Sequence, residues 1–572
     1  MALPLVNRRW VLKPADSRKV DDLHQALQIH PVLCRLLVLR GIDDYEAARR
    51  FFRPELGMLH DPFLMKGMDK AVARITEAVE WHERILVYGD YDVDGTTAVA
   101  VMYSFLRQRE GTNVSYYIPH RYREGYGISK QGVDFAIDNG YTLMITLDCG
   151  IKSVDLIAYA QSKGVDVIVC DHHTPGAQIP PAYAILNPKQ EDCLYPYKEL
   201  SGCGIGFKLI SALATAWKLD NSTVYQYLDL VATSIAADIV PVDGENRLLA
   251  YFGLSNANDN PSLSIKTLKD ISGLSKRICL SDLVFAIGPK INAAGRMDDA
   301  RKAVDMFIEQ DPGKIYALAG ELISDNDERK EVDKAITEEA MGILEGDPLL
   351  PRKVSTVLYR ENWHKGVVGI VASRLLDYCY RPTIILTGSS GKISGSARSV
   401  QGFNVYEALC ECADLLENFG GHFYAAGVTL KDGKYGEFVQ RFEEVVSRRI
   451  DRRLLTPEIA IDADILLEDI KPAFYNILKQ FAPFGPTNMR PVFRVRHVWD
   501  YQNGTRIVKD QHIRFSVHNR RGIIMEGIGF RLADKFSYTQ AGPFDIVFTL
   551  DENEFNGNTA LQMRVIDILP AQ

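Results

Sequence analysis

The chain lacks the cysteine pairs that a structural zinc site or a disulfide framework requires. Nine cysteines are scattered over 572 residues, and the closest approach, Cys410-Glu411-Cys412, is not a Cys-x-x-Cys pair. This pattern excludes the usual zinc spacings and a disulfide-rich secreted domain, and it indicates a reducing compartment.

A long hydrophobic run is also missing. No apolar stretch approaches the roughly 20 residues that a membrane-spanning helix needs. The first residues, Met1–Trp10, contain no apolar region of signal-peptide length. We therefore expect a cytoplasmic protein with no membrane partner.

Positive charge is not in excess. The 66 Lys and Arg against 74 Asp and Glu give a formal net charge of −8, whereas nucleic-acid binders usually show a basic balance. This argues only weakly against a nucleic-acid partner, because a cluster of acidic metal ligands itself adds several negative charges. The length exceeds the roughly 250–300 residues that one core supports, which predicts three or four domains.

Acidic stretches follow three apolar, β-branched runs. The runs end near Tyr88, Leu147 and Cys170, and they lead into Asp90-Tyr91-Asp92-Val93-Asp94-Gly95, Asp148-Cys149-Gly150 and Asp171-His172-His173. Such runs, separated by helix-like segments, are typical of buried parallel strands, whose carboxyl ends form the ligand crevice. The sequence therefore predicts five Asp and two His at one edge of a sheet. So many carboxylates stay ionised only if cations neutralise them, and this donor set suits Mg²⁺ or Mn²⁺.

Other interpretations apply to the Asp90–Gly95 stretch and to a fourth acidic position, Asp238. The Asp90–Gly95 stretch resembles the start of a calcium loop, but it lacks the Glu at loop position 12 and follows a strand, so an EF-hand is rejected. A fourth acidic point is expected at Asp238, inside the apolar run Leu230–Pro241, where a lone Asp needs a partner. The alternative for Asp238 is a salt bridge to Arg247.

Glycine-rich segments carry further polar side chains. Gly288–Arg296 and Gly391–Ser399, which we interpret as loops, offer donors suited to phosphate oxygens. Gly420-Gly421-His422 puts an imidazole on a close-approaching loop. Gly391-Lys392 does not fit the P-loop spacing, and Gly202–Gly206 does not fit the dinucleotide pattern.

The hydrophobic pattern predicts an α/β protein of several domains. We expect a helical lead-in over 1–65, a doubly wound parallel-sheet domain over 66–305, a long connecting helix over 306–347, a second α/β domain over 348–454 and a C-terminal β-barrel over 455–572. Five β-type runs between 492 and 569 make an OB fold the obvious candidate for the last domain.

The four acidic segments, taken in order, resemble the four motifs of the DHH phosphoesterase superfamily. Trp363–Arg374 and Phe419-Gly420-Gly421-His422 resemble its companion DHHA1 domain. Longer strings are similar to the bacterial RecJ family of single-strand-specific exonucleases: Arg121-x-x-Glu124-Gly125-Tyr126-Gly127, Gly288–Arg296, Gly395–Ser399 and Asn553–Gly557. The resemblance extends from about Trp10 to Ile568. It implies that 66–305 is the DHH domain, 348–454 the DHHA1 domain and 455–572 an OB domain that binds nucleic acid.

This resemblance implies a metal-dependent enzyme that hydrolyses single-stranded DNA from the 5′ end to mononucleotides, in DNA recombination and repair. The implied metal ligands are Asp90, Asp92, Asp94, Asp148, His172 and Asp238, around two Mn²⁺ or Mg²⁺ ions bridged by Asp148. The implied catalytic residues are His173, His422 and Asp148, and the implied phosphate-binding residues are Arg121, Asn292, Arg296, Arg398 and Ser399. Single-stranded DNA, a single-strand-binding protein and a helicase are the implied partners, and a monomer is expected.

One segment departs from the family pattern. The family's Pro-Phe-Gly-x-Gly-Asn-Pro-Glu-Pro stretch stands here as Pro483–Pro491, with Thr487 in place of the second Gly. The main alternative function is a DHH phosphodiesterase acting on short oligonucleotides or cyclic dinucleotides, against which the extra C-terminal β domain argues. A non-catalytic scaffold is the second alternative, but every acidic motif position is filled.

Overall fold

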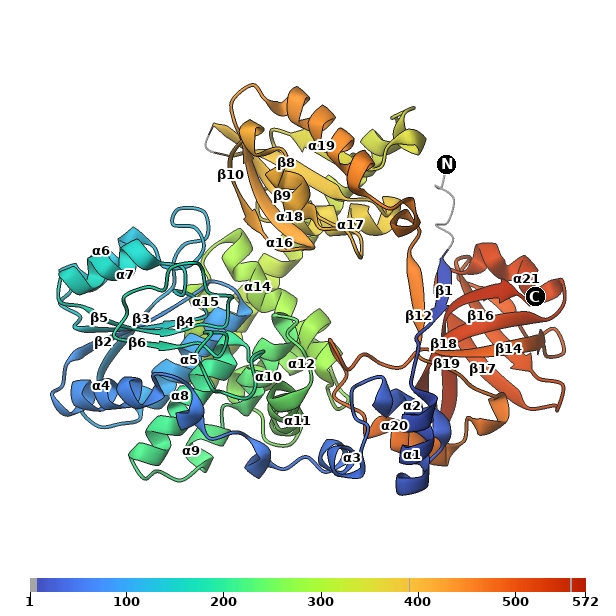
Figure 1. The fold of residues 1–572 in the computed structure, drawn as a ribbon, viewed down its shortest axis with the longest axis horizontal. Helices are drawn as coiled ribbons and strands as arrows, with labels where there is room; N and C mark the ends of the chain where they lie inside the picture. The colour runs from blue at the N-terminus through green and yellow to red at the C-terminus, as the bar shows by residue number, and fades with distance from the viewer. Residues whose placement is uncertain (1–7, 390, 556–557, 572) are drawn as a thin grey trace. The chain divides into compact units, whose positions relative to one another are not determined.

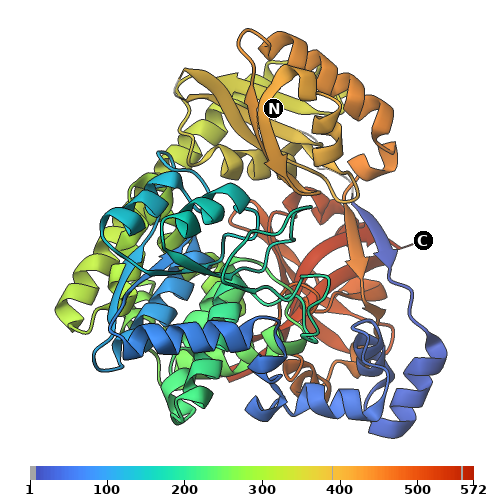
Figure 2. The same ribbon diagram turned by 60° about the vertical axis from the view of Figure 1, so that its left-hand side comes forward.

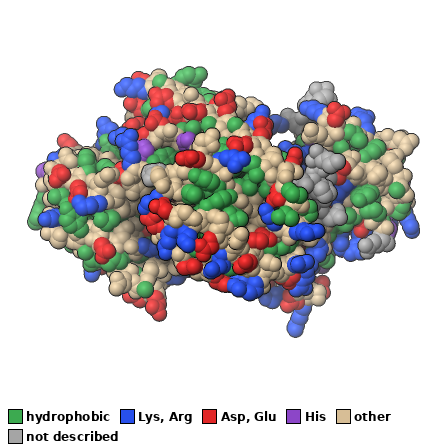
Figure 3. All heavy atoms as spheres, turned by 90° about the horizontal axis from the view of Figure 1, so that it is seen from above, with side chains coloured by type: hydrophobic (Ala, Val, Ile, Leu, Met, Phe, Trp, Pro, Cys, Tyr) green, Lys and Arg blue, Asp and Glu red, His purple; other side chains and the backbone are tan. Residues whose placement is uncertain are grey.

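The computed structural model describes residues 8–389, 391–555 and 558–571. The chain forms two compact units. One consists mainly of Ala317–Ile459, and the other mainly of Val11–Gly288 together with Ala460–Gln572. Among the described residues, no helix has the length and apolarity that crossing a membrane requires. On the face drawn in Figure 3, Lys and Arg side chains are interspersed with Asp and Glu, in keeping with the small net charge.

The larger unit contains a five-stranded sheet in the order β3-β2-β4-β5-β6. Its strands are β2 (Arg84–Gly89), β3 (Asn113–Tyr117), β4 (Leu143–Leu147), β5 (Asp166–Cys170) and β6 (Ala184–Leu186). All neighbouring pairs are parallel, so the expected parallel sheet is confirmed. The strand order reverses between β2 and β4, and in sheets of this order the ligand crevice lies outside the carboxyl ends of the strands at that point.

Helices cover both faces of this sheet, as Figure 1 shows. The helices on the sheet are α4 (Met68–Glu80), α5 (Val93–Arg107), α6 (Lys130–Asp138), α7 (Val154–Ser162) and α8 (Gly202–Ala216), while α10 (Leu228–Ala237), α11 (Gly244–Asp259) and α12 (Leu263–Ile271) lie beside it. One core joins α6 and α7 to the sheet through residues such as Val133, Ile157 and Tyr88. Burial on both faces explains why the strands read as continuous apolar runs rather than alternating ones.

The smaller unit has a mixed five-stranded sheet in the order β10-β11-β9-β8-β7. Its elements are β7 (Thr356–Arg360), α17 (Val368–Cys379), β8 (Thr383–Ser389), β9 (Lys392–Arg398), α18 (Val405–Cys410), β10 (Leu416–Gly421), β11 (Ala425–Leu430) and α19 (Tyr435–Arg449). Only β7 and β8 are parallel; the other pairs are antiparallel. Figure 2 shows the helices of this unit lying against the sheet.

The expectation about the glycine-rich segments was wrong. Gly288–Arg296, interpreted as a loop, is helix α14 (Gly288–Met297), and Gly391–Ser399 is largely strand β9. The long connecting helix expected over 306–347 is present as α16 (Pro312–Glu345), and the shorter α15 (Arg301–Ile308) precedes it. Proline at the first helical position explains the start of α16, because its missing N–H has no intrahelical partner there.

The C-terminal strands have the topology of an OB fold. They are β14 (Phe493–Asp500), β16 (His512–His518), β17 (Ile524–Gly529), β18 (Phe544–Phe555) and β19 (Asn558–Pro570), with the short β13 (Ala463–Asp464) and β15 (Arg506–Val508) at the ends of the sheet. Pairing runs β14-β18-β19-β17-β16 and returns to β14 through Trp499–His518 and Asp500–Val517. The β17–β19 pair is parallel, and the short β14–β16 pairing joins the two ends of this five-stranded order, as expected for an OB fold.

The N-terminal helices share the hydrophobic core of this OB sheet. Helices α1 (Ser17–Leu27), α2 (Pro31–Val38) and α3 (Tyr45–Phe52) contribute Leu23, Leu36 and Ala48 to the core that contains Phe493 and Phe548. The sequence pattern predicted the helices but not this packing. In addition, β1 (Arg9–Leu12) pairs with β12 (Glu458–Ile461).

Candidate metal centre

The predicted acidic residues converge at the carboxyl ends of the central strands. Asp90 follows β2, Asp148 follows β4, and Asp171-His172-His173 follows β5. Because β2, β4 and β5 are neighbouring parallel strands, their carboxyl ends meet at the switch point of the sheet. The expected convergence is therefore present in the fold.

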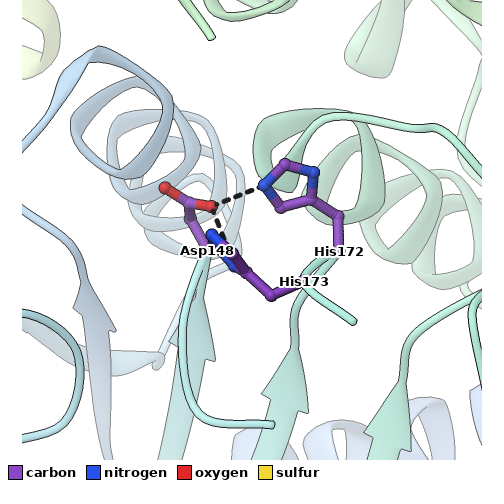
Figure 4. A group of neighbouring side chains, drawn as sticks. All are labelled: Asp148, His172 and His173. Carbon is purple, nitrogen blue, oxygen red and sulfur yellow. Dashed lines mark ion pairs between the residues drawn. The ribbon is translucent and has the colours of Figure 1, made fainter. Parts of the chain in front are cut away.

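His172 is surrounded by three carboxylates. Its Nε2 lies 3.1 Å from Asp148 Oδ1, 3.6 Å from Asp238 Oδ2 and 3.8 Å from Asp94 Oδ2. Figure 4 shows Asp148 facing both imidazoles, with His173 Nδ1 4.0 Å from the same Asp148 oxygen. The ligand atoms fall into three compact groups: Asp90, Asp92 and Asp148; Asp94, His172 and Asp238; and Asp148, His172 and His173.

Asp238 belongs to this cluster and makes no ion pair with Arg247. It caps the C-terminal end of α10, so the helix directs its carboxylate toward His172. The Arg247 guanidinium instead donates to the carbonyl oxygens of Phe51 and Ala482. The salt-bridge alternative for Asp238 was therefore wrong.

The N-terminus of helix α8 holds Asp94. The backbone N–H groups of Gly202 and Cys203 donate to its two carboxylate oxygens at 2.7 Å each, and Ser234 Oγ donates to it at 2.7 Å. A Cβ on Gly202 would lie 2.6 Å from the Asp148 Cβ, so glycine is needed for this approach. Sequence reasoning missed Gly202, Cys203 and Ser234; the available signal was the glycine-rich segment at a predicted helix start.

The tight turn after β2 fixes Asp90 and Asp92. Asp92 is the N-cap of α5, and its side chain accepts from Gly95 N at 3.0 Å. A Cβ on Gly95 would lie 2.4 Å from the Asp90 carbonyl oxygen, which explains the glycine after the third Asp. Asp90 Oδ1 accepts from Gly127 N at 3.4 Å.

The carboxylates of Asp90, Asp148 and Asp238 have pKa values above their usual range. Burial raises the pKa of Asp90, and the nearby Asp92 raises it further. Burial and then Asp94 act the same way on the pKa of Asp148 and on that of Asp238. A divalent cation would remove this repulsion and stabilise the ionised forms.

Two buried carboxylate oxygens fit a metal ion. Among the residues that the structure describes, Asp90 Oδ2 and Asp148 Oδ1 accept no hydrogen bond, and Asp148 Oδ1 has only its ion-pair contacts with His172 and His173. Buried polar atoms are almost always satisfied, and carboxylate oxygens with an imidazole are suitable donors for Mn²⁺ or Mg²⁺. Since Asp148 belongs to two of the compact ligand groups, the residues present also fit a pair of ions.

His173 is oriented by Asp171 rather than by the cluster. Its Nδ1 lies 2.7 Å from Asp171 Oδ1, and Tyr126 Oη lies 2.8 Å from its Nε2. Burial acts to lower the pKa of His173, but the hydrogen bond to Asp171 raises it overall. Burial likewise opposes ionisation of Asp171, and the bonds from His173 nevertheless lower its pKa. Burial lowers the pKa of His172.

Arg121 lies beside this cluster. Its guanidinium carbon is 4.7 Å from the centroid of the Tyr91 ring, and Tyr91 packs edge-on against Tyr126 at 6.4 Å. The sequence places Tyr91 between Asp90 and Asp92, so one aromatic side chain connects the acidic turn to the segment carrying Arg121.

Two of the predicted phosphate-binding arginines lie at the N-terminal end of α17. Arg296 donates to the Gly366 carbonyl at 3.0 Å, and a Cβ on Gly369 would lie 3.0 Å from an Arg398 guanidinium nitrogen. A helix N-terminus flanked by arginines is suited to anions. Burial lowers the pKa of Arg398.

The remaining predicted residues of the smaller unit lie on α14 and at neighbouring strand ends. The His422 N–H donates to Ala425, which pairs with Arg398. The Ser399 hydroxyl donates to the Phe403 carbonyl at 2.7 Å and is mostly buried. Asn292 is half-buried on α14. The Asn553–Gly557 string lies partly outside the described residues, which omit 556 and 557.

Three family models match separate parts of the chain. The DHH family N-terminal domain matches residues 84–235, the DHHA1 domain matches 353–448, and the RecJ OB domain matches 461–567. These matches cover the regions where the sequence motifs resemble the same families.

Relatives named single-stranded-DNA-specific exonuclease RecJ match nearly the whole chain. The Salmonella typhimurium protein is 36% identical, with 97% of this chain and 98% of that protein covered. The Bacillus subtilis protein is 35% identical, with 98% of this chain and 70% of that protein covered.

Solved structures agree with these relatives. RecJ from Thermus thermophilus in complex with Mn²⁺ superimposes with a TM-score of 0.85 at 27% identity, covering 100% of this chain and 80% of that chain. An exonuclease RecJ bound to manganese matches with a TM-score of 0.60 at 33% identity, covering 69% of this chain and 97% of that one. With DHH, DHHA1 and RecJ OB domains in this order and relatives of such coverage, the chain belongs to the RecJ family of the DHH superfamily.

Proposed function

We propose that this protein is a metal-dependent exonuclease that hydrolyses single-stranded DNA from the 5′ end to mononucleotides, in DNA recombination and repair. The observation that supports this most directly is the set of buried carboxylates at the β2/β4 switch point, two of whose oxygens lack a hydrogen-bond partner among the described residues. The RecJ relatives are named single-stranded-DNA-specific exonucleases, which supports the substrate and the type of enzyme.

The proposed cofactor is Mn²⁺ or Mg²⁺ at a two-ion site. Asp90, Asp92 and Asp148 would hold one ion, and Asp94, His172 and Asp238 would complete the site, with Asp148 shared. Bound there, the ions supply an activated water and neutralise charge on the scissile phosphate. The α8 N–H groups hold Asp94 in place, which keeps its carboxylate oriented without a metal.

The chain's own residues would bind and orient the phosphate. His173, held by Asp171, presents Nε2 near Tyr126 and is proposed to donate to the substrate. Arg121, beside Tyr91, is proposed to bind a phosphate oxygen.

The smaller unit is proposed to supply further contacts to the strand. Arg296 and Arg398, with the N-terminus of α17, would bind phosphates, and Asn292 and Ser399 would add polar contacts. His422, beside the Arg398 strand end, is proposed to contact the scissile phosphate.

The domain division follows the same logic. We propose that the DHH domain, over 66–305, is the hydrolytic domain and that a connecting segment, over 306–347, leads to the DHHA1 domain. The DHHA1 domain, over 348–454, is proposed to bind phosphates. The OB domain, over 455–572, is proposed to be a further single-strand-binding surface, and the N-terminal region, 1–65, is attached to its core. A monomer acting in the cytoplasm beside a single-strand-binding protein and a helicase is proposed as its working context.

Digestion of end-labelled oligonucleotides tests the activity. With Mn²⁺, a 5′-labelled single strand should release labelled mononucleotide at once, whereas a 3′-labelled strand should shorten gradually. Asp148→Asn should lower the rate by at least about 10³-fold, as expected when a metal ligand is removed, while Asp155→Asn, at an exposed position on α7, should leave it unchanged. Cleavage of dinucleotides alone, with long strands intact, would instead support the short-oligonucleotide phosphodiesterase.

A further inference from the structure

The segment between β3 and α6 carries two side chains that face the metal centre. Arg121 and Tyr126 both belong to it, and the chain enters it after Tyr117 and leaves it at Ser129, the N-cap of α6. We call residues 120–129 the Arg121 segment. Gly125 and Gly127 have positive φ values of 89° and 81°, which glycine adopts without strain.

The carboxylate of Glu124 binds both ends of the Arg121 segment. Its Oε1 accepts from the His120 backbone N–H at 2.7 Å, and its Oε2 accepts from Ser129 Oγ at 2.6 Å. The same Oε2 accepts from Tyr117 Oη at 2.9 Å. One side chain in the middle of the segment therefore fastens the beginning, the end and the preceding strand.

The three hydrogen bonds that Glu124 accepts are charge-assisted and therefore strong. A carboxylate that accepts from N–H and O–H donors makes charge-assisted hydrogen bonds, which are roughly twice as strong as neutral ones. Tyr88 adds a second attachment, because its Oη donates to the Gly127 carbonyl and accepts from Ser129 N. The backbone of the segment is thereby fixed from within.

The fixed backbone determines where the two outer side chains lie. Arg121 follows His120, whose N–H is bound to Glu124, and its guanidinium stacks on Tyr91. Tyr126 lies two residues after Glu124, and its hydroxyl is 2.8 Å from His173 Nε2. Glu124 itself is half-buried beneath the segment and bonds to none of the metal-cluster side chains among the described residues.

We propose that Glu124 is a positioning residue that holds Arg121 and Tyr126 for the terminal phosphate of the DNA strand. This inference rests on the proposed exonuclease function. Glu124 acts through the Arg121 segment, so its loss should weaken phosphate binding while the metal ligands stay in place.

The test compares Glu124→Ala, Glu124→Gln, Arg121→Ala and the Arg121→Ala/Glu124→Ala double variant, with Glu191→Ala as an exposed control in the same unit. For a 5′-phosphorylated strand, Glu124→Ala should raise KM by about 10- to 100-fold, the effect of losing a charged contact, with kcat within about threefold of the unsubstituted protein. Glu124→Gln should recover most of this loss, because an amide can accept from His120 N and donate to the two hydroxyls.

Two readouts separate positioning from general destabilisation. The KM effects of the two single variants should not multiply in the double variant, because Arg121→Ala already removes the contact that Glu124 supports through Arg121 and leaves only its effect through Tyr126. Preference for a 5′-phosphate over a 5′-hydroxyl should fall in Glu124→Ala, and Mn²⁺ affinity by calorimetry should not change. Multiplied effects in the double variant, or loss of Mn²⁺ affinity with KM unchanged, would overturn the inference.

Binding without turnover keeps this test independent of the proposed activity. Anisotropy of a labelled 5′-phosphorylated oligonucleotide in EDTA should show weaker binding by Glu124→Ala and by Arg121→Ala to a similar degree. If the unsubstituted protein digests no strand, the proposed function fails while this comparison still decides the role of Glu124. Equal affinity of Glu124→Ala and Glu191→Ala would refute it.

Discussion

At the scale of single residues, the acidic residues of the metal centre place like charges close together. Asp148 lies beside Asp94, Asp92, Asp238 and Asp90, each of which raises its pKa in addition to the effect of burial. Such an arrangement opposes folding unless a cation is bound, so the proposed metal ligands reduce the stability of the metal-free protein.

The stability of the metal-free protein should therefore fall as pH rises. The folded-state pKa values of Asp90, Asp148 and Asp238 lie above the ordinary value, so the folded state binds more protons than the unfolded state. Stability is then lost progressively from the ordinary Asp pKa of about 3.9 up to the raised values. In EDTA, Tm should decrease between pH 5 and pH 8, measured by calorimetry.

Metal addition should reverse this loss. An ion at 100 times its Kd adds about 2.7 kcal/mol to the free energy of unfolding, and the gain should be larger at pH 8 than at pH 5, because protons compete with the ion. Asp148→Asn should show a higher Tm in EDTA than the unsubstituted protein and a smaller response to MnCl₂. A Tm that does not change with pH in EDTA, and that does not rise when MnCl₂ replaces EDTA, would contradict the cluster as described.

At the scale of elements, the N-terminus of α8 is the support of the metal centre. Gly202→Ala would place a Cβ 2.8 Å from Asp148 Oδ1, which displaces either the helix or the carboxylate. We expect Mn²⁺ affinity, measured by calorimetry, to fall by at least about 10-fold, as for loss of a supporting contact to a metal ligand. Activity should fall with it.

Gly204→Ala is the matched control on the same helix turn. Its Cβ would meet Ser201 Oγ at 3.3 Å and no closer atom. The change should keep Mn²⁺ affinity and activity, and it should add up to about 1 kcal/mol of helix stability. Equal loss in both variants would show that any substitution in this turn, rather than the approach to Asp148, causes the effect.

The elements also show how far sequence reasoning extends. The acidic ends of β2, β4 and β5 could be predicted because parallel strands present their carboxyl ends at one edge, whatever the details of the helices. Their contacts with α8 could not, since Gly202 and Asp94 are separated by more than a hundred residues and nothing local marks the pairing.

Glycine content misled the prediction for Gly288–Arg296. Glycine and proline favour loops on average, but here Gly288 closes a π-helical turn, Leu283–Ile287, through its N–H to the Leu283 carbonyl. A Cβ on Gly288 would lie 3.0 Å from that oxygen. The wide turn leads directly into α14, so the helical backbone continues through Gly288 and Pro289 despite the local preference.

At the scale of the whole molecule, a basic residue of the DHH region holds the OB region. Arg247, buried on α11, donates to the carbonyl oxygens of Phe51, Gln480 and Ala482. Its guanidinium carbon lies 3.8 Å from the centroid of the Phe51 ring. Helix α3, the segment Gln480–Ala482 of the OB region and helix α11 of the DHH region therefore meet at the Arg247 side chain.

The segment that departs from the family pattern forms the other side of this contact. Val242 N donates to the Pro486 carbonyl at 2.8 Å, and a Cβ on Gly485 would lie 2.5 Å from Val242 Cγ2. Thr487, where the family has glycine, has φ 64°, a conformation that a β-branched residue seldom adopts. Asn488 is buried and donates to the Phe481 and Pro483 carbonyls, so the departure leaves the docking intact.

Removing Arg247 should uncouple these two regions. Arg247→Met keeps the apolar stem but leaves three carbonyl groups without their charged donor and removes the cation–π contact. We expect a loss of about 3 kcal/mol in the coupling, from typical values for charged hydrogen bonds and buried cation–π pairs. Calorimetry should then show an OB transition that separates from the DHH transition and moves to lower temperature.

Arg277→Met gives the control, because Arg277 is exposed and pairs only with Asp259 among the described side chains, a contact worth at most about 1 kcal/mol. It should melt like the unsubstituted protein. Since the OB surface would bind the strand beyond the metal centre, Arg247→Met should also raise KM for long strands more than for short ones. An unchanged melting profile in Arg247→Met would refute the coupling, because the three carbonyl groups would then have lost their charged donor without cost.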